Sequence, residues 1–177
     1  LLSQECDGSF DYEIIVVDNN SKDKTKEIVS GFKNRFNRRL IYAFEKQQFR
    51  SYALNMGIKV AKGEVIAFTD DDCIADKNWI KSINEIFVSK DLDLLGARVE
   101  PLFKTKIPEW LNIETMKGPI VYYNLGNRHI ENNERRIPIC GANMCFRKES
   151  FNKYGGFGFS GRGQDGELSN KWRRLGA

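Results

Sequence analysis

Three consecutive carboxylates, Asp70, Asp71 and Asp72, directly follow the apolar run Val65–Phe68. A buried parallel strand delivers the residues after it to the carboxyl edge of the sheet, where open α/β proteins bind their ligands. Adjacent carboxylates repel one another by ~1 kcal/mol in water and ~4 kcal/mol at intermediate dielectric, so this cluster favours a bound cation. Hard oxygen ligands select Mg²⁺ or Mn²⁺. The alternative is a solvated turn, and only the preceding strand shifts the balance towards a metal site.

The elements around this cluster alternate between strand and helix. The β-branched run at 13–17 predicts a buried strand, and similar runs at 40–44 and 65–68 predict two more. Apolar residues at near-helical spacing predict a helix before each of the last two strands, and Gly63 is expected to end the second helix as a left-handed cap. The alternation favours an α/β fold, Rossmann-like, with a mainly parallel central sheet flanked by helices.

Beyond the carboxylates the pattern is less regular. Asp76 is expected to cap a helix that carries Trp79, and 92–99 predicts a further strand. Prolines interrupt residues 100–137, which are interpreted as loops that shape a substrate pocket. A returning strand is expected at 139–146, a short helix at 147–154 ended by glycine, and a last helix at 165–175.

Composition narrows the class of protein. The 177 residues suit a single domain, and the net charge of +4 suits phosphate-bearing ligands or an anionic membrane face without requiring either. No apolar run approaches the ~18 residues needed to cross a bilayer. The four cysteines form no C-x-x-C pair and the chain has one histidine, so a zinc site is poorly supplied and reduced thiols in a cytoplasmic protein are expected.

Several blocks, in order, resemble the family 2 glycosyltransferases, which have a nucleotide-sugar-binding fold of the A type. They are the strand and acidic turn at 13–25, the helix region 50–64, the D-x-D-like block at 68–72, the G-A-N-M-x-F-R-like strand at 140–148, Gly155 to Phe157, and the E-D-x-[DE]-L-like block at 164–168. The resemblance implies a single catalytic domain over 1–177, with a nucleotide-sugar half at 1–99 and an acceptor-side half at 100–177.

The resemblance also implies roles for individual residues. Asp72 holds the metal, Asp165 is the catalytic base, and Asp18 hydrogen-bonds the nucleotide base. The other expected donor-binding residues are Asn20, Arg50, Asn55, Asp70 and Asp71, and those expected on the acceptor side are Asn143, Gln164, Glu167 and Trp110, the last chosen because it lies in the proline-interrupted region. From the residues alone, Asp18 equally predicts a turn, and Asp165 a helix cap.

Three departures from the family pattern matter. Gln164 replaces the usual glutamate before the base. The family's first strand is absent upstream of Leu1. Because that strand lies between the strands at 13–17 and 65–68, its loss would leave a gap in the sheet centre, so either the chain is a fragment or another element fills the slot. The Q-x-x-R-W block of processive synthases is also missing after Asp165, so a single sugar transfer is expected.

The expected function is a metal-dependent, inverting transfer of sugar from a nucleotide-diphosphate sugar, most commonly a UDP-sugar, to a hydroxyl of a glycan or lipid-linked acceptor, as in cell-envelope polysaccharide synthesis. No nucleic-acid partner is expected, and peripheral contact with the inner membrane face is left open. Two alternatives remain: a sugar-phosphate nucleotidyltransferase, which would need a glycine-rich phosphate loop near its start, and a catalytically silent nucleotide-binding module. Release of nucleoside diphosphate or of pyrophosphate distinguishes the two enzymes.

Overall fold

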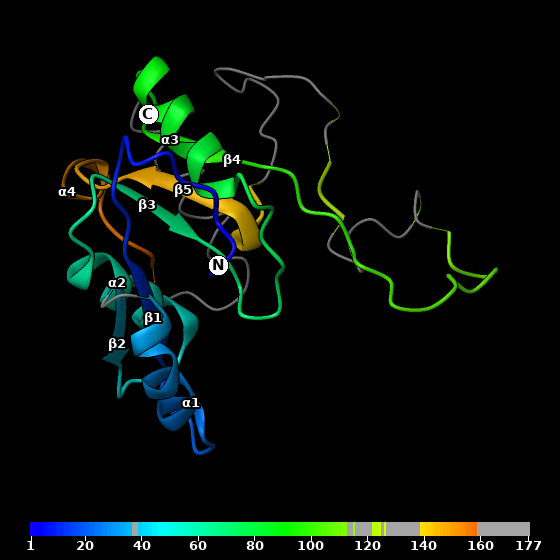
Figure 1. Cartoon of the computed structure of the whole chain (residues 1–177), viewed down its shortest axis with the longest axis horizontal. Coiled ribbons are helices and arrows are strands. Elements are labelled where there is room, and N and C mark those ends of the chain that lie inside the picture. The colour runs from blue at the N-terminus through cyan, green and yellow to red at the C-terminus, as the bar shows by residue number, and fades with distance from the viewer. Residues whose placement is uncertain (37–38, 113–114, 116–121, 125, 127–138, 159–177) are drawn as a thin grey trace.

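The first of two sheets is parallel and two-stranded. The computed structural model describes residues 1–36, 39–112, 115, 122–124, 126 and 139–158. β1 (Ile14–Asp18) pairs with β2 (Leu40–Phe44), with Ile14 opposite Leu40 and Asp18 opposite Phe44. Between them the chain forms α1 (Thr25–Phe32) and the 3₁₀ helix η1 (Lys33–Phe36). This strand–helix–strand unit is the one that the sequence predicts, and Figure 1 shows α1 beside its two strands.

The second sheet has three short strands in the order β3–β5–β4. β3 (Val65–Phe68) and β4 (Leu94–Gly96) both pair antiparallel with β5 (Met144–Arg147). The expected returning strand is therefore confirmed, although its bounds differ from the predicted 139–146. It begins only at Met144, because the 3₁₀ turn η2 (Gly141–Asn143) precedes it.

Helices cover both faces of this second sheet because its strand residues alternate between two apolar clusters. Met144 and Phe146 pack in a cluster with Leu54 of α2 (Arg50–Val60). Cys145, which lies between them, packs with Ile83 of α3 (Trp79–Ser89). The shared core is thus centred on β5, where Phe146 is 1% exposed.

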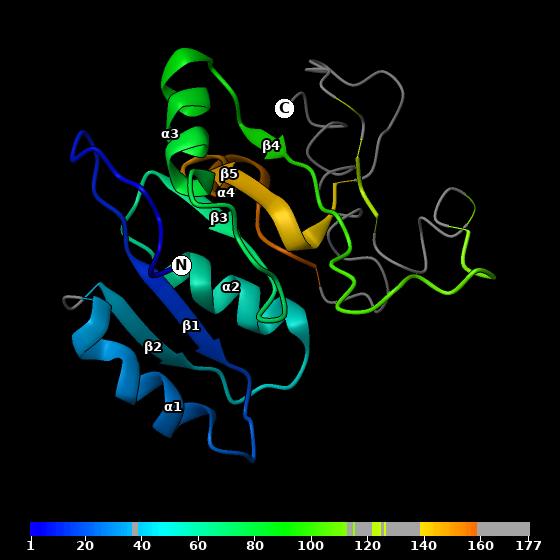
Figure 2. The same ribbon diagram turned by 45° about the vertical axis from the view of Figure 1, so that its right-hand side comes forward.

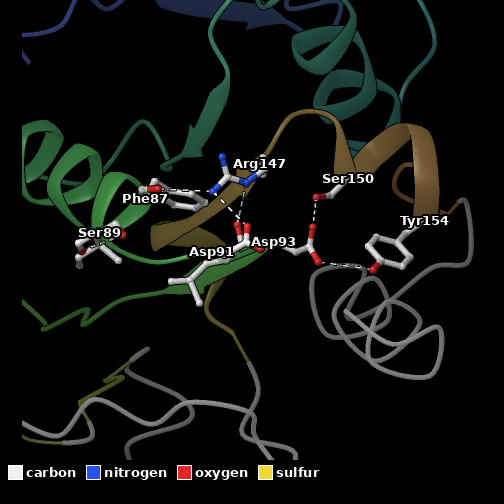
Figure 3. Close-up of polar contacts among 9 residues, drawn as sticks. Phe87, Ser89, Asp91, Asp93, Arg147, Ser150 and Tyr154 are labelled. Atoms are coloured by element: carbon white, nitrogen blue, oxygen red, sulfur yellow. Dashed lines mark hydrogen bonds and ion pairs between the residues drawn. The ribbon is translucent and has the colours of Figure 1, made fainter.

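The short helix α4 (Ser150–Tyr154) is attached to the strands by polar contacts as well as by apolar ones. Figure 3 shows the Asp93 carboxylate facing the hydroxyls of Ser150 and Tyr154, both of which donate to it. Arg147 donates through Nε to the carbonyl of Leu92 at 3.2 Å. These contacts connect the chain before β4 with the last residue of β5 and with α4.

β1 and β3 run in the same direction. At their starts, the Glu13 carboxylate accepts hydrogen bonds from the backbone N–H groups of Lys62 and Gly63, at 2.5 and 3.2 Å. At their ends, Asn19 accepts from the N–H of Phe49, and Arg50, the next residue, pairs with Asp70. Because β2 is parallel to β1 and β4 to β3, β5 is the reversed strand among the five described. Four of the five described strands thus run in the same direction, as the sequence predicts, although the hydrogen-bonded pairs of the second sheet are antiparallel.

β1 and β3 are not paired with each other, and they belong to separate sheets. A cavity of about 670 Å³ lies between them, with α2 and α3 as further walls; its lining includes Ile14, Val17, Gly57, Ala67 and Ile83. Figure 2 shows the two sheets on either side of this region. The gap that the family resemblance predicts in the sheet centre is present in the described part of the chain.

The expected left-handed cap at Gly63 is wrong. α2 ends at Val60, Ala61 is extended with φ −57° and ψ 138°, and Gly63 is absent from the described residues with positive φ. The Glu13 carboxylate, brought in by the tertiary fold, takes the N–H groups there instead. The glycine stop after the last described helix is confirmed at Gly155, which has φ 83°.

The predicted cap at Asp76 is only a turn contact. Its carboxylate accepts from the N–H of Asn78 at 2.8 Å, before α3 begins. The N–H of Ile80 inside the first turn of α3 donates instead to Oε1 of the distant Gln4, at 3.0 Å. The helix expected at 165–175 lies outside the described residues. Among the described helices, none has the length and apolar character needed to span a bilayer.

Candidate active site

Asp18 ends β1 with its carboxylate inside the protein. The residue is 5% exposed, its Oδ2 accepts from the Tyr42 hydroxyl at 2.6 Å, and its Oδ1 accepts from the N–H of Ser21 at 2.8 Å. The Tyr42 hydrogen bond, with that of Ser21, holds the pKa of Asp18 below its usual value, and the same carboxylate raises the pKa of Tyr42 to about 12. Asp18 is therefore ionised, and it makes the turn contact predicted as its alternative role.

The loop before α2 is held against the end of β1 by a side chain that the sequence analysis did not single out. Asn19 accepts from the N–H of Phe49 at 3.1 Å and donates to the carbonyl of Gln47 at 2.6 Å. Two non-glycine residues here have positive φ, 63° at Asn20 and 127° at Phe49. Such backbone costs about 1–3 kcal/mol per residue and is concentrated at functional sites. The run Asn19-Asn20-Ser21 after a strand was the available signal.

Arg50 and Asp70 meet at the carboxyl edge. Arg50 is the first residue of α2, and its guanidinium lies 3.0 Å from the Asp70 carboxylate just after β3. Figure 2 shows the loop after β3 beside this end of α2. Asp71 and Asp72 follow in the same exposed loop.

Ser51, the residue after Arg50 in α2, has a buried hydroxyl oxygen without a hydrogen-bond partner.

Two asparagines with predicted ligand-binding roles use both ends of their amides within the protein. Asn55 exchanges two hydrogen bonds with the backbone of Phe157, at 2.9 and 3.0 Å. Asn143 accepts from Trp79 Nε1 at 3.0 Å and donates to the Arg98 carbonyl at 2.9 Å. Neither amide points freely into a site, so their place in the structure is that of braces between elements.

The remaining predicted residues divide into two groups. Trp110 is 76% exposed in the proline-interrupted segment, a position that fits substrate contact but does not place it beside the carboxylates. Gln164, Asp165 and Glu167 lie outside the described residues. The structure therefore brings together Asp18, Asn20, Arg50 and the carboxylates after β3 at one edge, the carboxyl edge of β1 and β3.

The predicted metal ligands at this edge are carboxylates, and the Cys73 thiol lies 3.8 Å from the Asp72 carboxylate. The described residues contain no group of three or more His, Cys, Asp or Glu side chains arranged to hold an ion. Mg²⁺ sites commonly use one or two carboxylates and complete the shell with waters and substrate phosphates. The exposed carboxylates of Asp71 and Asp72 fit such a site, since Asp70 is engaged by Arg50.

Solved structures with similar folds carry nucleotide ligands. A mannosyltransferase from Pyrobaculum calidifontis, in complex with GDP-Man and Mn²⁺, matches with a TM-score of 0.68 and 18% identity over 93% of this chain and 43% of that one. TarS 1–349 from S. aureus, in complex with UDP, matches with a TM-score of 0.69 and 20% identity over 97% and 48%. These neighbours establish the fold as that of an A-type glycosyltransferase.

Curated relatives are closer in sequence but longer. Glycosyltransferase GlyG of Streptococcus pneumoniae is 39% identical over 114 residues, which are 64% of this chain and 34% of that protein. Glycosyltransferase AglE of Haloferax volcanii is 36% identical over 89 residues, 50% and 29% respectively. The chain thus spans about a third of the length of these relatives. The sequence model described as "Glycosyl transferase family 2" matches residues 1–155, and the chain therefore belongs to glycosyltransferase family 2.

Proposed function

We propose that this chain is the catalytic part of a metal-dependent, inverting glycosyltransferase that moves a sugar from a nucleotide-diphosphate sugar to a hydroxyl of a glycan or lipid-linked acceptor. The observation that carries the proposal is the meeting of Arg50 and Asp70 at 3.0 Å. It brings a cationic side chain, the positive end of α2 and the acidic loop after β3 to the same edge of the fold as Asp18.

This edge has the charges that a nucleoside diphosphate requires. The N-terminus of a helix and a guanidinium both favour phosphate oxygens. The Arg50–Asp70 pair is nearly half exposed, with side-chain exposures of 44% and 45%, and such pairs contribute only about 0–1 kcal/mol. Arg50 therefore exchanges Asp70 for a phosphate at little cost. Asp18, held ionised and oriented by Tyr42, is suited to accept hydrogen bonds from the nucleotide base.

Asp72 is the residue proposed to hold a divalent cation, Mg²⁺ or Mn²⁺. When bound, the cation would supply Lewis-acid stabilisation of the negative charge on the departing diphosphate. Asp70 is proposed to lie on the ribose side of the nucleotide, and Asp71 is proposed as a further donor-binding residue.

Asp165 is the proposed base. It removes the proton from the acceptor hydroxyl, a contribution typically worth ~10² to 10⁴ in rate. A base on the side opposite the leaving group gives in-line displacement and inversion at the anomeric carbon. Gln164, Glu167, Asn143 and Trp110 remain the proposed acceptor-side residues, with Asn143 acting through the chain it braces.

UDP is the first nucleotide to test and GDP the second, because TarS was solved with UDP and the Pyrobaculum mannosyltransferase with GDP-Man. The proposed setting is cell-envelope polysaccharide synthesis in the cytoplasm, with peripheral contact with the inner membrane face. No nucleic-acid partner is proposed.

The test separates metal-dependent binding from turnover. Calorimetry with UDP is expected to show binding with Mn²⁺ and its loss with EDTA, and Asp72→Ala is expected to remove the Mn²⁺-dependent part. Asp165→Asn is expected to keep that binding while lowering release of nucleoside diphosphate by ~10² to 10⁴. Asp91→Ala, which removes a fully exposed carboxylate near Arg147, is the matched control.

Three results contradict the proposal. Equal loss of UDP binding in the Asp72 and Asp165 variants contradicts the division of roles. Pyrophosphate as the product indicates nucleotidyl transfer instead. UDP binding in a chain that releases no nucleoside diphosphate from any UDP- or GDP-sugar indicates a silent binding module.

A further inference from the structure

Phe49 has a backbone conformation that phenylalanine rarely adopts. Its φ of 127° and ψ of 140° lie close to a region of backbone angles that is essentially restricted to glycine. Asn20 is the other described non-glycine residue with positive φ. Asparagine enters the left-handed region more easily because its short polar side chain bonds locally, whereas phenylalanine has no such compensation. The strain at position 49 therefore comes from the presence of a side chain, and glycine would relieve it.

Contacts on both sides hold the backbone at Phe49 in this conformation. Asn19 Oδ1 accepts from the N–H of Phe49 at 3.1 Å, and Asn19 Nδ2 donates to the Gln47 carbonyl at 2.6 Å. On the other side, the guanidinium of Arg50 lies 3.0 Å from the Asp70 carboxylate. Phe49 is thus fixed between the turn that follows β1 and the acidic loop that follows β3.

The Phe49 side chain contributes little to the fold. It is 70% exposed and belongs to neither of the two apolar clusters of the core. Because hydrophobic stabilisation scales with the apolar area removed from water, so exposed a ring does little to offset the strain of its backbone. Strained residues of this kind are concentrated at ligand sites. The large side chain at this position therefore points to a partner outside the fold.

We propose that Phe49 is a nucleotide-binding residue whose ring stacks on the base of the donor nucleotide. This inference rests on the proposed function, which assigns the base to Asp18 and the phosphates to Arg50. Phe49 stands between these two groups, because Asn19, the residue after Asp18, bonds to its N–H, and Arg50 is the next residue in the chain. An aromatic ring at that place covers a base whose edge lies at Asp18.

Stacking and hydrogen bonding act on different parts of a base. A carboxylate such as that of Asp18 accepts hydrogen bonds from N–H groups on the edge of the base, whereas an aromatic ring covers its face. Every base has such a face, so the stack adds affinity without selecting among bases. Selection between uracil and guanine is then left to groups at the edge, Asp18 among them.

The test compares two ligands as well as two side chains. UDP is measured against UDP whose uracil is reduced to 5,6-dihydrouracil, which keeps the hydrogen-bonding edge and loses the flat aromatic face. In calorimetry with Mn²⁺, Phe49→Ala is expected to weaken UDP binding ~5- to ~150-fold, as for one base–aromatic stack, and Phe49→Tyr to restore it. Wild type is expected to prefer UDP to the reduced nucleotide by a similar factor, and Phe49→Ala to bind both about equally.

Phe44→Ala is the matched control. Phe44 is also an exposed phenylalanine, at 49%, and it ends β2 at the same edge without a positive φ. The Kd of this variant for UDP is expected to stay within about twofold of wild type. If GDP is the tighter ligand of the wild-type chain, the same comparison of Phe49→Ala with Phe44→Ala is made with GDP.

Thermal melts without nucleotide test the strain separately from binding. Phe49→Gly is expected to have a higher Tm than Phe49→Ala, because glycine alone relieves the backbone. Both variants are expected to bind UDP more weakly than wild type. A change that raises stability while weakening UDP binding is the combination expected when the side chain serves the ligand rather than the fold.

Four results overturn the inference and leave the proposed function standing. They are normal UDP affinity in Phe49→Ala, equal weakening in Phe44→Ala and Phe49→Ala, an undiminished preference of Phe49→Ala for UDP over the reduced nucleotide, and a Tm of Phe49→Gly at or below that of Phe49→Ala. If the wild-type chain binds neither UDP nor GDP with Mn²⁺, the proposed function itself fails and the stack fails with it.

Discussion

At the scale of single residues, the carboxyl edge has one buried carboxylate that accepts hydrogen bonds within the protein, and others that are exposed to solvent. Asp18 accepts hydrogen bonds from Tyr42 and Ser21, whereas Asp71 and Asp72 lie open in the loop after β3. The first arrangement fixes a side chain in one protonation state and one orientation. The second leaves oxygen atoms accessible to a cation. Both arrangements suit the proposed site, in which the nucleotide is bound through its base and its phosphates.

The Asp18–Tyr42 pair predicts a dependence of stability on pH. Because the folded-state pKa of Asp18 is lowered, its contribution is present above the ordinary carboxyl value of 3.8 and is lost as pH falls through the folded pKa. Tyr42→Phe removes the largest cause of the lowered pKa. We expect this variant to have a lower Tm than wild type at about pH 7, and the difference to shrink towards about pH 2.5.

Thermal melts at both pH values check this expectation. Tyr12→Phe is the matched control, because the Tyr12 ring lies under the Arg39 guanidinium at 4.9 Å, a contact that phenylalanine keeps. Its effect on the Tm should be the same at both pH values. A Tyr42→Phe deficit that is equally large at about pH 2.5 would show that packing, not the charge of Asp18, causes it.

At the scale of elements, the second sheet depends on the return of the chain after β5. α4 ends at Gly155, where φ 83° and ψ 168° reverse the backbone and lead it to Phe157. That combination of angles is accessible essentially to glycine alone. A five-residue helix has little stability of its own, so its end is set by this reversal and by the hydroxyl contacts to Asp93.

Gly155→Ala is therefore expected to lower the free energy of unfolding by about 1–3 kcal/mol. Urea denaturation followed by circular dichroism measures the change. Gly31→Ala in α1 is the control, since no atom lies within 4 Å of its built Cβ and its φ is not positive. It should raise stability by about 0.5–1 kcal/mol, because alanine is the better helix former. Equal effects of the two changes would contradict the assigned strain.

At the scale of the whole molecule, the two described sheets lie on either side of one cavity and share no hydrogen-bonded edge. The cavity of about 670 Å³ between β1 and β3 is lined largely by apolar side chains from both strands and from α2 and α3, and its lining also includes Glu13, Glu64 and Arg147. Apolar surface of this kind attracts apolar ligands because it is removed from water on binding. Here β1 and β3 face each other across the cavity without hydrogen bonds between them.

The cavity predicts binding of the dye ANS, whose aromatic rings are apolar and whose sulfonate is negatively charged, to the folded chain. Fluorescence enhancement is expected in wild type and is expected to fall in Ala67→Glu, which places a negative charge in the cavity wall. Ile28→Glu on α1 is the control, because Ile28 is 58% exposed and is not part of the lining. Near-ultraviolet circular dichroism confirms that both variants stay folded. The same enhancement in both variants would place the dye elsewhere.

Local patterns in the sequence determined most of the elements and the carboxylates of the site. The apolar runs predicted β1, β2 and β3 to within a residue, because a continuous apolar run fits a strand covered on both faces. The resemblance carried by ordered blocks predicted the family, and the family model confirms it. The structure places Asp18, Arg50 and Asp70, three of the predicted donor-binding residues, at the carboxyl edge of β1 and β3.

Contacts between distant parts of the chain were decided by the tertiary structure alone. The Glu13 carboxylate accepts hydrogen bonds from the N–H groups of Lys62 and Gly63. The Gln4 side chain accepts one from the N–H of Ile80, and the Asn55 side chain accepts one from the N–H of Phe157. The partners in these hydrogen bonds are 49 to 102 residues apart in the sequence. No local pattern encodes such partners, because hydrogen-bonding capacity is a property of a residue whereas the choice of partner depends on how the elements pack. The amides of Asn55 and Asn143 likewise bond to Phe157 and to Trp79 and Arg98, while their roles in ligand binding stay predictions.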